Sequence, residues 1–282
     1  METKHLVEDY VFHKQTFAEL KGAYGMDKRT LRGLLNQSKI KTKQHHPRPI
    51  HLIVDGTYFG ERKEGRSWCA IVARDPYKKE NLVWSFEETE TTYAYADIRE
   101  RLEGLGYTIQ SITGDGFAGI RSAFHGIPFQ MCHVHMERLV IQGITRNPQT
   151  EAGQVLLAIT KTIHHTNSHL FTERLRMFQE KYRVFLNEKT IHPFTGDWSY
   201  THDGVRAAWR SLLRFRPYLF TYEHDKQIPK TTNSLEGHFR HAKKQVEVHN
   251  GLSKQNKQKN LDLIFLASTT SPNKKQLKKL FK

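Results

Sequence analysis

Residues 50–59 decide the fold: they read Ile-His-Leu-Ile-Val-Asp-Gly-Thr-Tyr-Phe, an apolar and β-branched run typical of a buried strand. Short β-rich runs and stretches with helical spacing follow it along the chain. They predict further strands at 67–74, 81–87, 107–113 and 127–132, with helices at 92–106 and 117–125. The order β-β-β-α-β-α-β indicates an α/β fold in which helices flank a mixed five-stranded sheet.

The chain before this strand predicts a short helical segment and a basic linker. Apolar spacing predicts helices at 15–21 and 27–37, with Asp27 as the N-cap of the second. Two short helices across a glycine turn are typical of a helix-turn-helix, although a plain helical hairpin fits equally well. The second helix would begin with three cations, Lys28, Arg29 and Arg32. Residues 39–49 predict an extended basic linker that completes an N-terminal segment over 1–49.

The second half of the chain has a different pattern. The first part of the core, 50–135, is followed at 136–230 by residues with no strand pattern, which predict an all-helical insertion. Residues 231–250 predict one more helix of the core, and the lysine-rich residues 251–282 predict a basic C-terminal tail.

Composition excludes several classes of protein. Of the 282 residues, 37% are hydrophobic and 11% aromatic, which indicates a folded chain with a real core. With a mean hydropathy of −0.66, no apolar run approaches the ~20 residues of a membrane span, and no secretory signal begins the chain. Two cysteines make no disulfide framework, so we expect a reducing, cytoplasmic setting.

Charge is distributed unevenly. The formal net charge is +15, of which residues 1–49 carry +5 and residues 238–282 carry +9, leaving a nearly neutral middle. Cationic ends predict binding to a polyanion, because each neutralised phosphate releases condensed counterions. The alternative is a solubilising basic surface or a disordered basic tail.

Three acidic residues are candidate metal ligands. Asp55 and Asp115 each follow an apolar strand and precede glycine, at a sheet edge where sites of α/β proteins form. Asp-Gly is also ordinary turn chemistry, so either pair has a purely structural interpretation. Glu236 would bring a third carboxylate from a helix, although Asn233-x-x-Glu236 also has capping-box spacing. Three such carboxylates would suit one or two Mg²⁺ ions.

Two further groups of residues have functional and structural interpretations. Cys132 and His135 have the Cys-x-x-His spacing of half a zinc site, but a structural role at a strand–helix junction fits better because no second pair lies at finger spacing. Trp209, with Arg210 and neighbouring arginines on one predicted helix, suits stacking on an unpaired base beside phosphates. Packing in the core is the alternative for this tryptophan.

Four motifs in order resemble the Mutator-type transposases of bacterial insertion sequences, a branch of the DDE transposases with a ribonuclease-H-like core. They are Val54-Asp55-Gly56, Thr113-Gly-Asp115-Gly116, Gln130-Met-Cys132-His-Val-His135 and Thr231-Thr-Asn-Ser-Leu-Glu236. The resemblance covers roughly the C-terminal four-fifths of the chain.

The resemblance implies a function and a set of site residues. Asp55, Asp115 and Glu236 would be the metal-binding catalytic triad, with two Mg²⁺ (or Mn²⁺) ions as cofactor, and Cys132 and His135 would organise the site. The enzyme would cleave element ends at terminal inverted repeats and join them to target DNA, working on double-stranded DNA as a homodimer at the nucleoid. The expected DNA contacts are Lys28, Arg29, Arg32, Trp209, Arg210, Arg240, Lys243 and Lys244.

The chain departs from the family pattern at its N-terminus. Only 49 residues precede the core, and no Cys-x-x-Cys zinc module is present. Either the reading frame is truncated, or the short helical pair alone reads the element ends. The competing functions are a non-catalytic DNA-binding relative and a metal-dependent nuclease on the same core.

Overall fold

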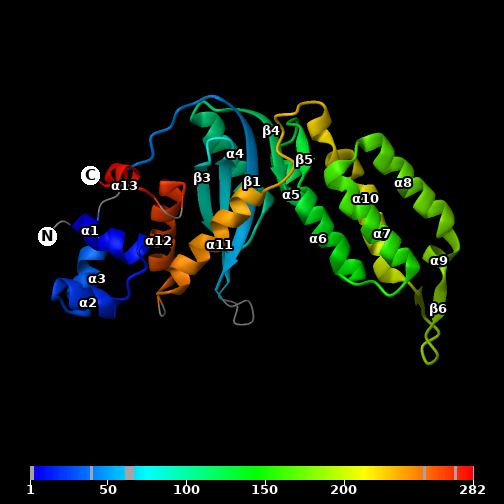
Figure 1. The fold of residues 1–282 in the computed structure, drawn as a ribbon, viewed down its shortest axis with the longest axis horizontal. Helices are drawn as coiled ribbons and strands as arrows, with labels where there is room; N and C mark the ends of the chain where they lie inside the picture. Colours follow the sequence, from blue (N-terminus) through cyan, green and yellow to red (C-terminus); the bar gives the residue numbers. More distant parts are fainter. Residues whose placement is uncertain (1–2, 39–40, 61–66, 250–251, 270–271, 282) are drawn as a thin grey trace. The chain divides into compact units, whose positions relative to one another are not determined.

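The computed structural model describes residues 3–38, 41–60, 67–249, 252–269 and 272–281 (Figure 1). It divides the chain into two compact units, Met1–Ile109 with Asn233–Lys282 as unit 1, and Gln110–Thr232 as unit 2. Within the described part of the chain, no helix is both long and apolar enough to cross a membrane.

The main sheet has five strands in the order β3-β2-β1-β4-β5. They are β1 Pro49–Phe59, β2 Trp68–Asp75, β3 Glu80–Glu87, β4 Thr108–Gly114 and β5 Phe129–Met131. The first three form an antiparallel meander, and β4 pairs with β5 in parallel. This strand order confirms the predicted mixed sheet of the ribonuclease-H-like fold. Every residue of β2 is buried, as expected for a strand covered on both faces.

Unit 1 is built around the meander. Its helices are α1 Thr3–Val7, the π-helix η1 Glu8–Phe12, α2 Phe17–Tyr24, α3 Lys28–Gln37, α4 Thr92–Gly104, α11 Asn233–Glu247, α12 Lys254–Ala267 and α13 Lys274–Leu280. Alternate residues of β1 and β2, among them Ile53 and Val72, share one hydrophobic core with α1–α3 and α11–α13. Helix α4 packs against β2 and β3, and its buried residues lie outside that core.

The expected C-terminal tail is instead part of this core, so that prediction is wrong. Helices α12 and α13 bury apolar side chains against the rest of unit 1, including Leu261, Ile264, Phe265 and Leu277. In α12 the lysines precede the buried residues, and in α13 exposed lysines flank two buried leucines, so a reading of composition missed the apolar side chains. The basic charge of this segment therefore lies on folded structure.

The N-terminal helical pair is confirmed with small shifts in its bounds. The Asp27 side chain accepts hydrogen bonds from the backbone N–H groups of Arg29 and Thr30, as an N-cap should. The break between α2 and α3 falls at Gly25, whose φ of +65° suits glycine at a helix C-terminus. Helix α1 and η1, which the sequence did not predict, add further apolar side chains to the unit 1 core.

Unit 2 is mainly helical. Its helices are α5 Ala118–Ala123, α6 His133–Ile144, α7 Glu151–Lys161, the 3₁₀ helix η3 Thr162–His165, α8 Ser168–Lys181, α9 Arg183–Asn187, α10 Asp203–Leu219 and the 3₁₀ helix η4 Thr221–Glu223. Helices α6 and α10 approach closely at Gly143 and Gly204: a Cβ built on Gly204 would lie 2.3 Å from the Gly143 carbonyl oxygen. Only glycine fits this contact without a shift of one helix.

The prediction of an all-helical insertion is wrong at one point. A small antiparallel hairpin, β6 Lys189–Ile191 and β7 Trp198–Tyr200, projects between α9 and α10 (Figure 1). Each strand has only three residues, too few for an alternating pattern to register in the sequence. The hairpin exposes large apolar side chains, Ile191, Phe194 and Trp198.

Candidate active site

Asp55 lies inside a strand and not in a turn. It pairs with Val72 across β1 and β2, and Gly56 pairs with Ile71, so the ladder continues through the Asp-Gly pair. The Asp55 side chain is 7% exposed, and its Oδ1 accepts a hydrogen bond of 2.9 Å from the Gly56 N–H. A Cβ on Gly56 would lie 2.0 Å from Glu90 Oε1, so a larger residue here would require the flexible Glu90 side chain to move. The turn interpretation of this pair is therefore wrong.

Glu236 lies in the first turn of α11, partly buried. The helix begins at Asn233, which makes Thr232 the N-cap and places Glu236 one position beyond the capping-box position. Its neighbour Leu235 belongs to the core that α11 shares with β1. The carboxylate is thus held on a helix that packs directly on the strand of Asp55.

Asp55 and Glu236 belong to the same side of unit 1. By strand alternation Asp55 points to the same face as Ile53 and Phe59, two residues of the core with α11. Helix α11 supplies Leu235 and Phe239 to that core. The structure therefore brings two of the three predicted carboxylates to the face of β1 that α11 covers.

Asp115, in unit 2, directly follows β4. Its Oδ1 accepts a hydrogen bond of 2.9 Å from the Phe117 N–H, so here the Asp-Gly pair does form a turn, leading into α5. A Cβ on Gly116 would lie 2.8 Å from the Phe215 ring, which explains that glycine. The turn orients the carboxylate, and it leaves the second oxygen without a hydrogen bond to any of the described residues.

Cys132 and His135 interact through the residue that precedes α11. The Thr232 backbone N–H donates to Cys132 Sγ at 3.3 Å. The Thr232 hydroxyl lies 3.5 Å from that sulfur and 3.4 Å from His135 Nδ1. Burial alone would raise the pKa of the Cys132 thiol, but His135 and Thr232 reverse that effect and lower it. The Cys-x-x-His pair therefore anchors residue 232 to the strand–helix junction.

The chain that leads to α11 is fixed along β4 and β5. The Thr113 hydroxyl donates to the Pro229 carbonyl at 2.7 Å, and the His133 N–H donates to the Lys230 carbonyl at 3.0 Å. With the bonds of Thr232, these contacts hold residues 229–232 at the ends of the two strands. Helix α11 starts at the next residue.

Gln130 and His133 are structural residues that the sequence analysis did not single out, although both lie in or beside the quoted Cys-x-x-His motif. The two side chains donate to the Leu219 carbonyl, at 2.9 and 2.7 Å, and Gln130 also accepts from the Tyr222 N–H. Burial lowers the pKa of His133 to about 4, so the ring is neutral near pH 7. The pair ties the end of α10 to β5.

The predicted DNA contacts in unit 2 have mixed exposure. Trp209 is partly buried, with its indole Nε1 inaccessible to solvent, whereas Arg210 is exposed. Arg206 packs over the Tyr200 ring at 3.7 Å and donates to the Leu186 carbonyl at 2.8 Å, so it braces the hairpin. The partial burial of Trp209 is what core packing would give, and Trp198 is the more exposed indole.

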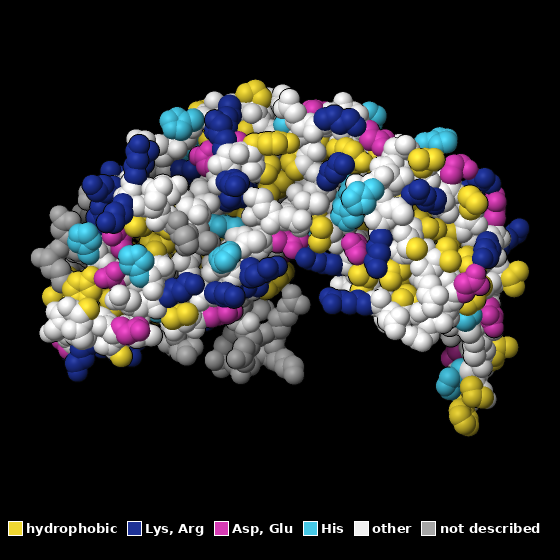
Figure 2. Space-filling view, in the orientation of Figure 1, with side chains coloured by type: hydrophobic (Ala, Val, Ile, Leu, Met, Phe, Trp, Pro, Cys, Tyr) yellow, Lys and Arg dark blue, Asp and Glu magenta, His cyan; other side chains and the backbone are white. Residues whose placement is uncertain are grey.

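The predicted contacts in unit 1 are mostly exposed. Figure 2 shows Lys and Arg side chains gathered over α11, where Arg240 and Lys244 are exposed and Lys243 lies over the Phe59 ring at 5.5 Å. On α3, all three predicted cations are exposed, and two of them, Lys28 and Arg32, contact the Phe17 ring at 5.6 and 5.5 Å. These positions are compatible with contacts to phosphates.

Comparison with known families and structures gives one match of wide extent. The model of the IS66 family of transposases matches residues 34–253. No curated protein sequence matches the chain.

Two solved structures are similar in part. The Drosophila P element transposase strand-transfer complex has a TM-score of 0.47 and 10% identity, covering 98% of this chain and 93% of that one. A simian T-cell lymphotropic virus intasome with the PP2A regulatory subunit B56 gamma has a TM-score of 0.23 and 15% identity, covering 57% and 69%. Both TM-scores lie below 0.5, so the fold assignment rests on the strand order.

Proposed function

Because the chain belongs to the IS66 family of transposases, we propose that it cleaves the ends of its DNA element and joins them to target DNA with the aid of a divalent metal. The expectation of a transposase is confirmed at the level of the family. The Mutator-type assignment is wrong, because the matching model over 34–253 is that of a different family.

We propose Asp55, Asp115 and Glu236 as the ligands of Mg²⁺ or Mn²⁺. Their oxygen donors suit a hard cation, and each carboxylate is oriented by structure, Asp55 in a paired strand, Asp115 in a turn and Glu236 in a packed helix. When bound, such a cation supplies Lewis-acid stabilisation of phosphoryl oxygens and lowers the pKa of a bound water. The observation that carries the proposal is the position of Asp55, which is buried within a paired strand on the face of β1 that α11 covers.

The Cys132–His135 pair has a positioning role in this proposal. It holds Thr232, and Glu236 follows four residues later, which in a helix is a rise of about 6 Å. Helix α11, which carries Glu236, begins directly after the residue that this pair holds. The strand order supports the same grouping, because β1, which carries Asp55, neighbours β4, which leads to Asp115.

We propose double-stranded DNA as the partner. The net charge of +15 and the exposed cations of α3 and α11 support contacts to phosphates. Assembly as a homodimer on DNA stays a prediction from the original resemblance.

The deciding experiment is a strand-transfer assay with a duplex of the element end, in Mg²⁺ and then in Mn²⁺. We expect Asp55→Asn, Asp115→Asn and Glu236→Gln each to abolish cleavage and joining while DNA binding is kept. Glu247→Gln is the matched control, because this exposed residue ends the same helix as Glu236. Binding without any cleavage by the native protein would favour the non-catalytic alternative, and cleavage without joining would favour the nuclease.

A further inference from the structure

Unit 1 contains an open cavity of about 910 Å³ away from the proposed metal ligands. It is formed by the turn between β2 and β3, the start of α11 and the residues after α12. Its lining is rich in cations and donors, including Arg74, Lys78, Lys79, Ser234 and His241. On α11 the lining residues centre on a direction about 140° around the helix from Glu236. None of the three proposed metal ligands is among its lining residues.

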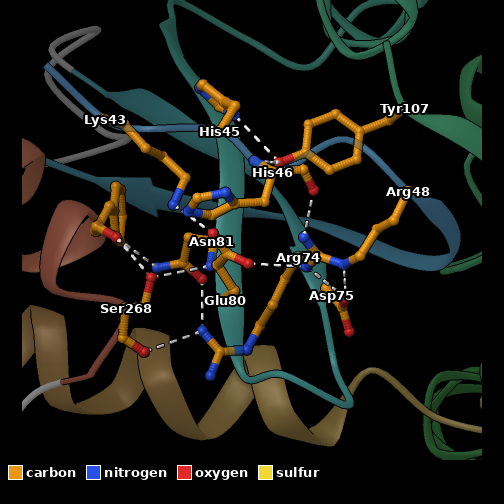
Figure 3. Close-up of polar contacts among 11 residues, drawn as sticks. Lys43, His45, His46, Arg48, Arg74, Asp75, Glu80, Asn81, Tyr107 and Ser268 are labelled. Carbon is orange, nitrogen blue, oxygen red and sulfur yellow. Dashed lines mark hydrogen bonds and ion pairs between the residues drawn. The ribbon is translucent and has the colours of Figure 1, made fainter. Parts of the chain in front are cut away.

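Arg74 is a buried cation in this cavity. Its side chain is 4% exposed, and its Nε donates to the Ser234 hydroxyl at 3.1 Å. Its Nη1 donates to Asn81 Oδ1 at 2.5 Å and to the Ser268 carbonyl at 3.3 Å (Figure 3). All three acceptors are uncharged. Burial lowers the pKa of Arg74 to about 10, and the charge of the nearby Asp75 offsets this effect only in part.

Two carboxylates beside Arg74 along the chain, Asp75 and Glu80, are engaged by other cations. Arg48 Nη2 lies 2.7 Å from Asp75 and 2.8 Å from Glu80, and Lys43 Nζ lies 2.8 Å from Glu80 (Figure 3). Among the described residues, no carboxylate lies within ion-pair distance of Arg74. The lining is thus positive in formal charge, with the cations Arg74, Lys78 and Lys79 against the single carboxylate of Glu80.

Two further features favour an anion at this position. The 15-residue helix α11 begins here with Asn233, Ser234 and Gly237 on the cavity, and a helix N-terminus attracts negative charge. At the mouth, Lys78 and Lys79 are both exposed. The buried guanidinium, the helix N-terminus and these lysines therefore face one space.

We propose that this cavity binds a phosphate group, with Arg74 and the start of α11 at its base and Lys78 and Lys79 at its mouth. A neighbouring cavity of about 410 Å³ shares Glu80 with it and is lined by Lys41, Lys43 and Lys279. Cations spread over two adjoining cavities match a polymer with repeated phosphates better than a single free ion. The source of the phosphate is then the DNA backbone, a step that rests on the proposed function.

The test is lysine acylation read by mass spectrometry, without divalent cation so that no cleavage occurs. One arm adds a DNA duplex and the other adds inorganic phosphate. We expect the duplex to protect Lys78 and Lys79 at least about tenfold, and to leave the exposed Lys161 unprotected. Protection by inorganic phosphate alone would move the source to a free anion. No protection in either arm would overturn the site.

Charge-reversed variants give a second, independent readout. Lys78→Glu/Lys79→Glu should weaken duplex binding and reduce the salt dependence by about one counterion for each lysine. The matched control is Lys21→Glu/Lys161→Glu, which makes the same charge change at two exposed positions outside this cavity. An equal effect in both pairs would mean general electrostatics and would refute a specific site. In Arg74→Gln, checked for folding by circular dichroism, the duplex should no longer protect the two lysines.

These outcomes are separable from the proposed function. Protection of the lysines from acylation requires neither a metal nor strand transfer. We therefore expect the same protection in Asp55→Asn as in the native protein. A protein that binds at Lys78 and Lys79 yet never cleaves would keep this site and lose the enzyme assignment.

Discussion

Phe265→Ala tests whether the C-terminal residues belong to the core of unit 1. The side chain is fully buried in α12, and its ring lies 5.9 Å from that of Trp84 and 6.3 Å from that of Phe239. Truncation of such a phenylalanine costs about 3–5 kcal/mol, through lost burial and the cavity left behind. Small domains have about 5–15 kcal/mol of stability, so in the middle of that range the change would remove about 30–50% of it.

The assay is urea unfolding followed by circular dichroism, with thermal unfolding as a second measure. At roughly 2–4 °C per kcal/mol for a unit of this size, the melting temperature should fall by about 6–20 °C. Phe194→Ala is the matched control, because the same truncation at a residue that is 92% exposed should change stability by under about 0.5 kcal/mol. A loss below about 1 kcal/mol for Phe265→Ala would refute the reasoning, since a detachable tail would behave in that way.

Three further changes probe other parts of the molecule. Partial burial raises the pKa of Glu80, but Lys43 and Arg48 lower it below the unfolded value of about 4.5. The ionised Glu80 side chain therefore stabilises the fold above about pH 4.5, and this stabilisation is lost as the pH falls further. Arg48→Met should flatten that pH dependence in acid unfolding curves. Burial lowers the pKa of His133 to about 4, against 6.5 in the unfolded chain. The neutral ring therefore contributes fully to the free energy of unfolding above pH 6.5, and this contribution is lost as the pH falls toward 4. His133→Leu should remove this part of the pH dependence of stability, and an unchanged dependence would contradict a buried neutral ring. Gly204→Ala should destabilise unit 2 by about 1–3 kcal/mol, because the clash with the Gly143 carbonyl outweighs the roughly 1 kcal/mol gain in helix propensity; a more stable variant in calorimetry would count against the close α6–α10 contact.

The sheet was predictable because its signals are local. The run around Asp55 and the strands after it are dense in β-branched and aromatic residues, and the structure has five strands in the expected chain order. The site was predictable only in part. The motifs pointed to the right residue types, but the same Asp-Gly dipeptide is mid-ladder at Asp55 and a turn at Asp115. Local spacing does not distinguish the two, because strand pairing with β2 decides the first case.

Other errors have physical reasons of the same kind. Residues 251–282 carry many lysines, and a count of charge does not show that Leu261 and Phe265 align on one buried face. The hairpin at Trp198 was missed because three-residue strands have no period to detect. Arg74 gave no signal at all, since a lone arginine in a strand becomes unusual only when its burial and its uncharged partners are known.

The amino-acid sequence by itself determined the succession of strands along the chain, the N-terminal helical pair and the acidic residues worth testing, because these depend on neighbours a few positions apart. Tertiary structure alone decided that the C-terminal lysine-rich helices are core, that Asp55 is buried in a continuous ladder, and that Arg74 is buried with uncharged hydrogen-bond partners. Each of these is a contact between residues far apart along the chain. Burial and charge compensation are properties of such contacts, so they exist only once the chain has folded.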